Sequence, residues 1–175
     1  MSLTADGMLR DGSHTLAETL LQPGPMVSRE RVLLTDPIRA TLALPDGWLE
    51  LSIRRPEVAW IYPVLARLQH LGSLQANWDS HGGRRISGDA IVTSLHVLGA
   101  VMEDQTPSPW IVPRSDGGLQ LEWHEGARDL ELLIRPDNRV ALYFSDDSGA
   151  EEQSESAVGP SQTPMIRDFL SRVTG

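Results

Sequence analysis

One stretch of the sequence concentrates side chains that could do chemistry: LQANWDSHGGRRISGD, residues 74–89. Asp79 and His81 place a carboxylate and an imidazole two residues apart, so they could form a general acid/base pair or supply two metal ligands. A two-residue separation on a loop is not the ligand spacing of a helix. Any third ligand must therefore come from elsewhere in the chain, and the stretch holds at most part of a catalytic or metal site.

The same stretch permits two other interpretations. Residues 82–85, Gly-Gly-Arg-Arg, precede an expected helix and resemble an anion cradle, although the P-loop spacing is missing. Alternatively the loop is structural. Asn77 and Asp79 then hydrogen-bond the loop backbone, and Trp78 fills the core. The glycines turn the chain toward Ser87, which begins the next helix. We expect the structural role, while the catalytic and anion-binding roles stay open.

The composition excludes several kinds of chemistry. The chain has 175 residues, a net charge of -9, no Cys, and 15 basic residues that are all Arg. Without Cys or Lys there is no disulfide, thiolate, Schiff-base or P-loop chemistry, and the acidity argues against direct nucleic-acid binding. No apolar run approaches the roughly 18 residues of a membrane helix, and the first residues lack the pattern of a signal peptide. We therefore expect a cytoplasmic, lysine-free bacterial protein with no membrane insertion and no cofactor.

The elements that position these side chains follow from hydrophobic periodicity. Alternating apolar and polar residues predict strands, and apolar residues three and four apart predict helices. The expected strands are 40–44, 49–53, 110–114, 119–125, 129–135 and 140–146, and the expected helices are 57–71, 87–103 and 164–173. This order predicts an α+β fold. An N-terminal hairpin and a C-terminal meander make an antiparallel β-sheet, two central helices pack on one face, and a short C-terminal helix follows.

The expected organisation has four parts. They are a flexible tail (1–28), a single α+β domain (29–145), an acidic flexible linker (146–162) and a C-terminal amphipathic helix (163–175). The apolar face of that helix consists of Met165, Ile166, Phe169, Leu170 and Val173. On a flexible tether such a helix suits docking in a groove of a partner protein, and it suits packing on its own sheet equally well.

The hairpin at 119–135 has a register that the sequence predicts. A two-residue turn at Gly126-Ala127 pairs apolar residues with one another: Trp123 with Leu130, Leu121 with Leu132, and Leu119 with Ile134. The other face then carries His124 opposite Asp129 and Glu122 opposite Glu131. Tyr143 lies beside Glu131 if residues 136–138 form a three-residue loop.

Two glutamates directly opposite each other repel, so something should compensate. Arg84 could lie over Glu122 and Glu131, or a metal could bind both. They could share a proton, which raises one pKa as in a general acid. They could also be exposed, so that water screens the repulsion, or they could face a basic partner surface. The sequence favours the solvated or arginine-paired arrangement and leaves the others open.

Loop and hairpin together resemble a family of uncharacterised bacterial proteins. Those sequences carry a loop of the form Asn-Trp-Asp-Gly-(aromatic)-Gly-Ala, a helix that starts with Ser, and a strand reading Asp-Gly-Gly-x-x-Leu-Glu-Trp. The matching residues here are Asn77, Trp78, Asp79, Gly82, Asp116, Gly117, Gly118, Leu121, Glu122 and Trp123. His81 departs from the usual aromatic residue and Arg84 from the usual small one. The resemblance covers roughly residues 70–135. It implies no activity, but it implies that loop and hairpin belong to one module.

These observations favour a non-enzymatic interaction protein, an accessory, adaptor or antitoxin-like subunit of a bacterial multi-protein system. The catalytic constellation is incomplete, and the acidic charge indicates another protein, of basic character, as the partner. The candidate partner-binding residues are Asp79, His81, Arg84, Arg85, Glu122, His124, Glu131, Met165, Ile166, Phe169 and Leu170. The alternative is a metal-assisted hydrolase that uses Glu122, His124, Asp129 and Glu131 together with Asp79 and His81. An enzyme needs the loop and the sheet face to reach a common substrate atom, whereas a binding protein needs only an exposed surface.

Overall fold

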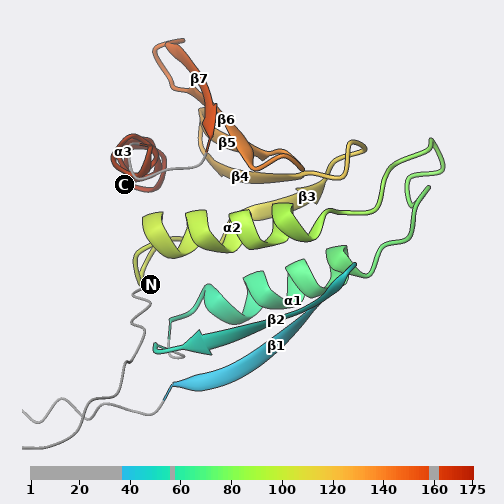
Figure 1. Ribbon diagram of the computed structural model, residues 1–175. Coiled ribbons are helices and arrows are strands. Elements are labelled where there is room, and N and C mark those ends of the chain that lie inside the picture. The colour runs from blue at the N-terminus through green and yellow to red at the C-terminus, as the bar shows by residue number, and fades with distance from the viewer. Residues whose placement is uncertain (1–36, 56–57, 158–161) are drawn as a thin grey trace, which may run out of the picture. The chain divides into compact units, whose positions relative to one another are not determined.

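The structure is a computed structural model that describes residues 37–55, 58–157 and 162–175. The elements, in chain order, are β1 (Ile38–Leu44), β2 (Gly47–Ile53), α1 (Ile61–Gly72), α2 (Gly88–Val101), β3 (Trp110–Pro113), β4 (Leu119–Glu125), β5 (Arg128–Ile134), β6 (Arg139–Ser145), β7 (Glu151–Ala157) and α3 (Thr163–Thr174) (Figure 1). The expected α+β fold is confirmed. The predicted tail, residues 1–28, lies outside the described residues.

The strands form two antiparallel sheets. β1 and β2 make a hairpin, and β3 to β7 make a five-stranded meander in sequential order. The hairpin does not join the meander, and α1 contacts both β1 of the hairpin and β3 of the meander. Arg67 Nε of α1 donates to the backbone carbonyl oxygen of Ile111 in β3 at 2.8 Å. The Arg67 side chain of α1 thus occupies a backbone acceptor of β3 that a neighbouring strand would otherwise use.

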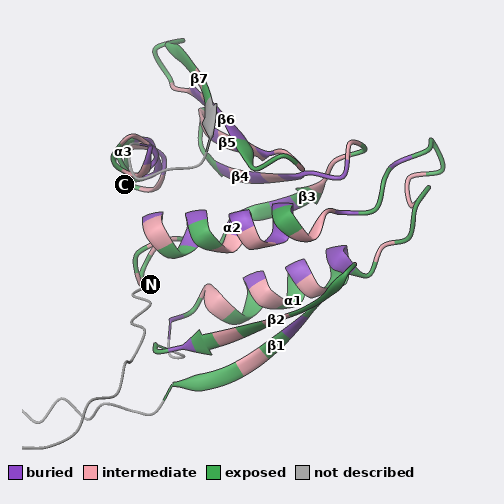
Figure 2. Cartoon of the chain, viewed as in Figure 1, coloured by how far each residue is buried: buried purple, intermediate pink, exposed green. Residues whose placement is uncertain are grey.

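The core lies on one face of the five-stranded sheet. The apolar residues of β4 and β5 that the register places together, Leu119, Leu121, Leu130, Leu132 and Ile134, are all 0% exposed. Helices α2 and α3 contact each other, and both contact β4 and β5. Buried residues accordingly run along α2 and along β4, β5 and β6 (Figure 2). The opposite face of this sheet, which we call the outer face, carries the alternate side chains.

Helix α2 begins where its capping residue predicts. Ser87 has extended backbone angles, and its hydroxyl accepts a hydrogen bond from the Asp89 backbone N–H at 3.2 Å. The side chain of a capping Ser satisfies one of the donors that a helix start leaves free, and the Asp89 carboxylate suits the positive end of the helix dipole. The start of α2 is therefore fixed by local chemistry.

The expected boundary between the domain and an acidic linker needs correction. Residues 146–162 do not form a linker throughout, because residues 151–157 are strand β7, paired with β6 from Ser145↔Glu151 to Arg139↔Ala157. The compact unit also extends over Asp36–Gly175 rather than ending at residue 145. β7 has no apolar alternation, and its described side chains are largely exposed (Figure 2). The acidic sequence therefore gave no periodic signal for a strand.

The sequence left two roles open for α3, and in the structure its apolar face packs within the chain. Ile166, Phe169 and Leu170 are each 3% exposed, and Met165 is partly buried against the same core. The Phe169 ring stacks on the Phe144 ring of β6 with centroids 4.6 Å apart. The apolar face of α3 packs against its own sheet, because α2 leaves part of the core face of the sheet for α3 to cover. In the described part of the chain, no helix combines the length and the apolar character needed to cross a membrane.

We expect Phe169→Ala to lower the free energy of unfolding by about 3–5 kcal/mol, because it leaves a cavity against Phe144. Asp168→Ala, on the exposed side of the same helix, should change it by less than about 1 kcal/mol. Urea unfolding followed by circular dichroism measures both. Equal stability of the two variants would contradict the packing of α3 on its own sheet.

Candidate functional site

The loop before α2 is organised by hydrogen bonds among its own residues. The Asn77 backbone N–H donates to the Gly83 carbonyl oxygen at 2.7 Å, and the Asn77 side-chain oxygen accepts from the Gly82 N–H at 2.8 Å. Asn77 and Ser80 both have positive φ angles, 66° and 62°. Asn is one of the few residues that tolerate this conformation. The loop is thus a closed structure of its own rather than an open cradle.

The Asp79 carboxylate occupies the position that an anion would take. Its Oδ1 accepts from the backbone N–H groups of His81 at 2.8 Å and Gly83 at 2.9 Å. A Cβ on Gly83 would lie 2.7 Å from the Asp79 carboxylate, so only glycine leaves room for it. The hydrogen bond from His81 and then that from Gly83 lower the pKa of Asp79. The sequence supplies an internal anion, and the predicted anion cradle at 82–85 is already filled.

The other side chains of the loop support this structural role. The His81 ring nitrogen Nδ1 lies 2.6 Å from the Asp79 backbone oxygen. Trp78 does not fill the core, as the sequence predicted, but is half-buried and donates from Nε1 to the Arg84 carbonyl oxygen at 3.0 Å. Arg84 and Arg85 are exposed, and no ion pair of theirs occurs among the described residues.

The loop joins the turn between β3 and β4 backbone to backbone. The Arg84 N–H donates to the Ser115 carbonyl oxygen at 2.9 Å, and the Ser87 N–H donates to the Gly117 carbonyl oxygen at 2.8 Å. Gly117 has a φ of 89°, and a Cβ there would lie 2.8 Å from the Arg85 carbonyl oxygen. Two separate constraints, the left-handed backbone and the close approach, therefore require glycine at this position.

The other candidate site residues that the sequence indicated, those of the hairpin β4–β5, lie together on the outer face of the five-stranded sheet. The predicted register is confirmed, with Glu122 opposite Glu131 and His124 opposite Asp129. Tyr143 lies opposite Glu131, as the three-residue loop requires. The same row continues to Trp110 on β3 and Gln153 on β7. One line of side chains therefore crosses all five strands: Trp110, Glu122, Glu131, Tyr143 and Gln153.

The repulsion between Glu122 and Glu131 is relieved by a different partner for each. His124 Nε2 lies 3.2 Å from Glu122 Oε2, and His124 Nδ1 lies 2.6 Å from Asp129 Oδ1. Gln120 Nε2 donates to Glu131 Oε2 at 3.0 Å. The hydrogen bond with Asp129, and then that with Glu122, raise the pKa of His124. Each carboxylate thus has a hydrogen-bond partner on the outer face, and Arg84 is not among these partners.

Loop and outer face do not form one site. The polar groups of the loop bond within the loop and to the β3–β4 turn, whereas His124 and Gln120 bond to carboxylates of the sheet. In residues 37–55, 58–157 and 162–175 no group of three or more His, Asp or Glu side chains is arranged to hold a metal ion. The helix residues Met165, Ile166, Phe169 and Leu170 belong to neither surface, because they pack against the core.

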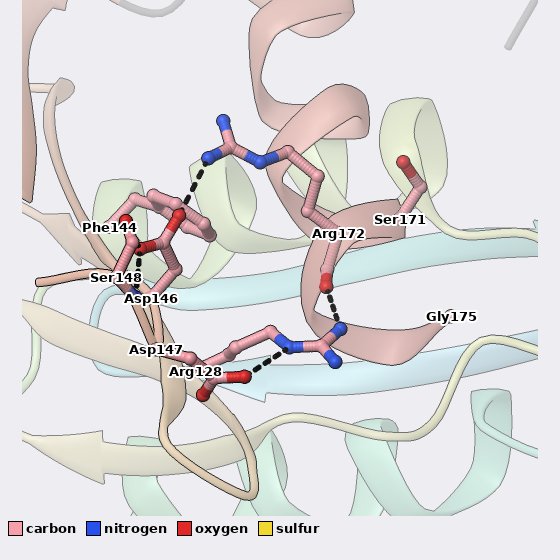
Figure 3. Close-up of a pocket in the computed structure, with 8 residues that line it drawn as sticks. All are labelled: Arg128, Phe144, Asp146, Asp147, Ser148, Ser171, Arg172 and Gly175. Carbon is pink, nitrogen blue, oxygen red and sulfur yellow. Dashed lines mark hydrogen bonds and ion pairs between the residues drawn. The ribbon is translucent and has the colours of Figure 1, made fainter. Parts of the chain in front are cut away.

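Sequence reasoning missed a cluster at the end of α3. Arg172 stacks over the Phe144 ring at 4.2 Å from its centroid, and its Nη2 lies 3.2 Å from Asp146 Oδ2 (Figure 3). Arg128 Nη1 donates to the Arg172 carbonyl oxygen at 2.6 Å. These groups line a hollow of about 470 Å³. The Arg and Asp residues are far apart in the sequence, so no spacing pattern could have indicated the cluster, which ties α3 to the β6–β7 turn.

Comparison of the chain with protein-family models, with curated proteins and with solved structures finds no match.

We expect Gly117→Ala to destabilise the protein more than Gly126→Ala. Both glycines have positive φ, 89° and 65°, so both substitutions introduce backbone strain, of about 1 kcal/mol each. Only at Gly117 does a Cβ also collide with a neighbour, since Gly126 has nothing within 4 Å. That overpacking should add about 1–3 kcal/mol. Urea unfolding of both variants measures the difference, and equal destabilisation would show that the loop and the turn are not in close contact.

The depressed pKa of Asp79 predicts a pH-dependent contribution to stability. A carboxyl whose folded-state pKa is lowered stabilises the fold above its unfolded-state pKa, and this stabilisation is lost as the pH falls through the folded-state value. The free energy of unfolding of the wild type should therefore exceed that of Asp79→Asn above about pH 5, and the difference should shrink below about pH 4. Denaturation at a series of pH values measures it. A difference that stays constant with pH would contradict the role of the carboxylate.

Proposed function

We propose that the protein is a non-enzymatic interaction module, an accessory, adaptor or antitoxin-like subunit of a bacterial multi-protein system. In this proposal the partner docks on the outer face of the five-stranded sheet. The observation that carries it is Trp110, which is 73% exposed and lies opposite Glu122. The helices pack against the other face, whose side chains are the buried ones. A large, exposed aromatic ring at the β3 end of a sheet row supports a role in contact with another molecule.

The neighbours of Trp110 support a basic protein as that partner. Glu122, Asp129 and Glu131 are half-buried on the same face, and Val112, next to Trp110, is 37% exposed. An aromatic ring beside carboxylates suits an Arg side chain, which can stack on the ring and pair with the carboxylates. The net charge of -9 adds a long-range attraction for a basic protein.

The alternative, a metal-assisted hydrolase, has less support. It needs Asp79 and His81 to act together with Glu122 and His124. Asp79 instead accepts two backbone hydrogen bonds inside the loop, and His124 lies between two carboxylates of the sheet. Groups that are each engaged with separate neighbours are poorly placed to share a substrate atom.

We also propose that the Asn-Trp-Asp loop and the Asp-Gly-Gly turn are the common module of the proteins that this sequence resembles. The support is physical. The loop and the turn are joined by two backbone hydrogen bonds, and Gly83 and Gly117 each leave room for a neighbour that a side chain would displace. Substitution on one side of this contact should therefore disturb the other.

The experiment is co-purification of the tagged protein from its native cell extract, quantified by mass spectrometry. The variant Trp110→Ala/Glu122→Gln removes the aromatic ring and the neighbouring carboxylate at the β3 end of the outer face. The matched control Trp48→Ala/Glu50→Gln removes the same residue types from the hairpin, where Trp48 is 76% exposed and Glu50 is also exposed. We expect a stoichiometric basic protein that is retained by the control and lost from the outer-face variant.

A photo-crosslinking amino acid at Val112 tests the location directly, because this residue is exposed beside Trp110. It should crosslink to the same protein that co-purifies. Failure to recover any stoichiometric partner would overturn the interaction role. Loss of the partner only in the hairpin control would move the docking surface to the other sheet.

A further inference from the structure

The two edges of the five-stranded sheet differ in whether they can accept another strand. At the β3 edge the pairing positions are blocked. The Arg114 N–H donates to the Gly118 carbonyl oxygen. By the alternation of an antiparallel ladder, Ile111 and Pro113 then direct their backbone groups away from β4. The Ile111 carbonyl oxygen is taken by Arg67 at 2.8 Å, and Pro113 has no N–H to donate.

The β7 edge has no such protection. The Asp146 N–H donates to the Ala150 carbonyl oxygen at 3.2 Å, which marks residues 146 and 150 as a hydrogen-bonded pair. Along the continuous register the backbone groups of Glu151, Gln153 and Glu155 then point away from β6. Within the described residues no strand pairs with this edge. β7 thus presents a row of backbone donors and acceptors, which is a template for a further strand.

The side chains beside this edge define what kind of strand fits. A hollow of about 440 Å³ opens on the outer face, lined by Asp129, Glu131, Tyr143, Ser145, Glu151 and Gln153 among others. Glu152 and Glu155 already pair with arginines of the chain. Glu131 and Glu151 have no cation within ion-pair distance among the described residues. The hollow therefore offers carboxylates that are not neutralised from within the chain.

We propose that the open edge of β7 accepts an extended basic segment of a partner protein as a sixth strand. Backbone bonds to Glu151, Gln153 and Glu155 hold the segment, and its alternate Arg or Lys side chains lie over the hollow beside Glu131 and Glu151. This is the mode of recognition by strand addition, in which the backbone gives affinity and alternate side chains give specificity. The inference rests on the proposed interaction role and names the chemistry of its partner.

A second copy of the chain fits this edge poorly. Antiparallel pairing of two β7 strands centred on Gln153 places Glu151 of one copy opposite Glu155 of the other. This pairing brings Glu151 no cation of its own, because Arg135 and Arg139 already pair with Glu155. An alternating basic strand instead places a cation directly opposite Glu151. Charge therefore selects a basic segment over self-association.

The test uses a fluorescent peptide, Thr-Arg-Thr-Arg-Thr-Arg-Thr, with both termini blocked, and the full-length protein at physiological salt. Anisotropy should show saturable binding, and amide hydrogen exchange by NMR should show new protection at Glu151, Gln153 and Glu155. Ser154 should change little, because its N–H already faces β6 by the alternation of the ladder. Binding without this alternating protection would overturn strand addition.

Chemical variants of the peptide test the geometry without altering the protein. The Arg residues of the added strand direct their N–H groups toward β7, so N-methylation of the three Arg residues should abolish binding. N-methylation of the Thr residues should be tolerated, because their N–H groups face away. The block sequence Thr-Thr-Arg-Arg-Arg-Thr-Thr should bind about tenfold more weakly, since it has the same charge without the alternation. Equal binding by all four peptides would reduce the effect to non-specific charge attraction.

On the protein, Glu151→Lys should weaken peptide binding about tenfold. Glu125→Lys, an equal charge change at the exposed β4–β5 turn, should weaken it by less than about twofold.

Sedimentation of the free protein checks for a dimer, and a dimer that Glu151→Lys strengthens or breaks would assign the edge to a second copy. If the peptide fails while partner capture still depends on Trp110, strand addition is wrong and the interaction role stands. If neither the peptide nor a partner binds, both are wrong.

Discussion

The contact between the loop before α2 and the turn before β4 is the constraint on which the rest of the domain depends. Two backbone hydrogen bonds, Arg84 N–H to Ser115 and Ser87 N–H to Gly117, fix where α2 begins relative to where β4 begins. Between them Ile86 is 0% exposed. Because this apolar side chain is buried between the two hydrogen bonds, the loop cannot slide along the turn without exposing it to water. The contact therefore sets the position of α2 over the sheet, and with it the face that α3 must cover and the face that is left uncovered.

This constraint also explains why the stretch with the most reactive residue types bonds its own backbone. A loop that must meet a turn backbone to backbone needs its own conformation held rigidly, and polar side chains do this by bonding the local backbone. The Asn77 side-chain oxygen accepts a hydrogen bond from the Gly82 N–H. The Asp79 carboxylate accepts from the N–H groups of His81 and Gly83. The residue types that could have bound an anion or a metal instead hold the loop in shape. The polar side chains of the outer face, in contrast, are not required for the core.

The sequence predicted the sheet register well because register follows from a pattern with a period of two. A slip of one residue would turn Leu121 and Trp123 outward, so the pairing of β4 with β5 had only one solution. The position of Glu122 opposite Glu131 then followed from the register. The hydrogen bonds of Glu122 with His124 and of Glu131 with Gln120 could not be predicted, because residue spacing does not determine side-chain rotamers. β7 was missed because its Glu, Gln and Ser residues show no apolar alternation before the final Ala157. The role of α3 was left open, because an amphipathic face indicates that something covers it and not what does so.

A strand that buries almost nothing needs another reason to stay in place, and the C-terminal cluster supplies it. Arg172 stacks on Phe144, pairs with Asp146 and reaches Glu152 of β7 at 3.4 Å. Arg135 and Arg139 both pair with Glu155 at 3.3 Å near the other end of the strand. Single exposed ion pairs contribute little, but pairs at both ends of one strand restrict the same seven residues together. Hydrogen bonds to β6 and these arginines thus hold β7 extended without a hydrophobic face, which keeps its outer backbone edge ordered and exposed.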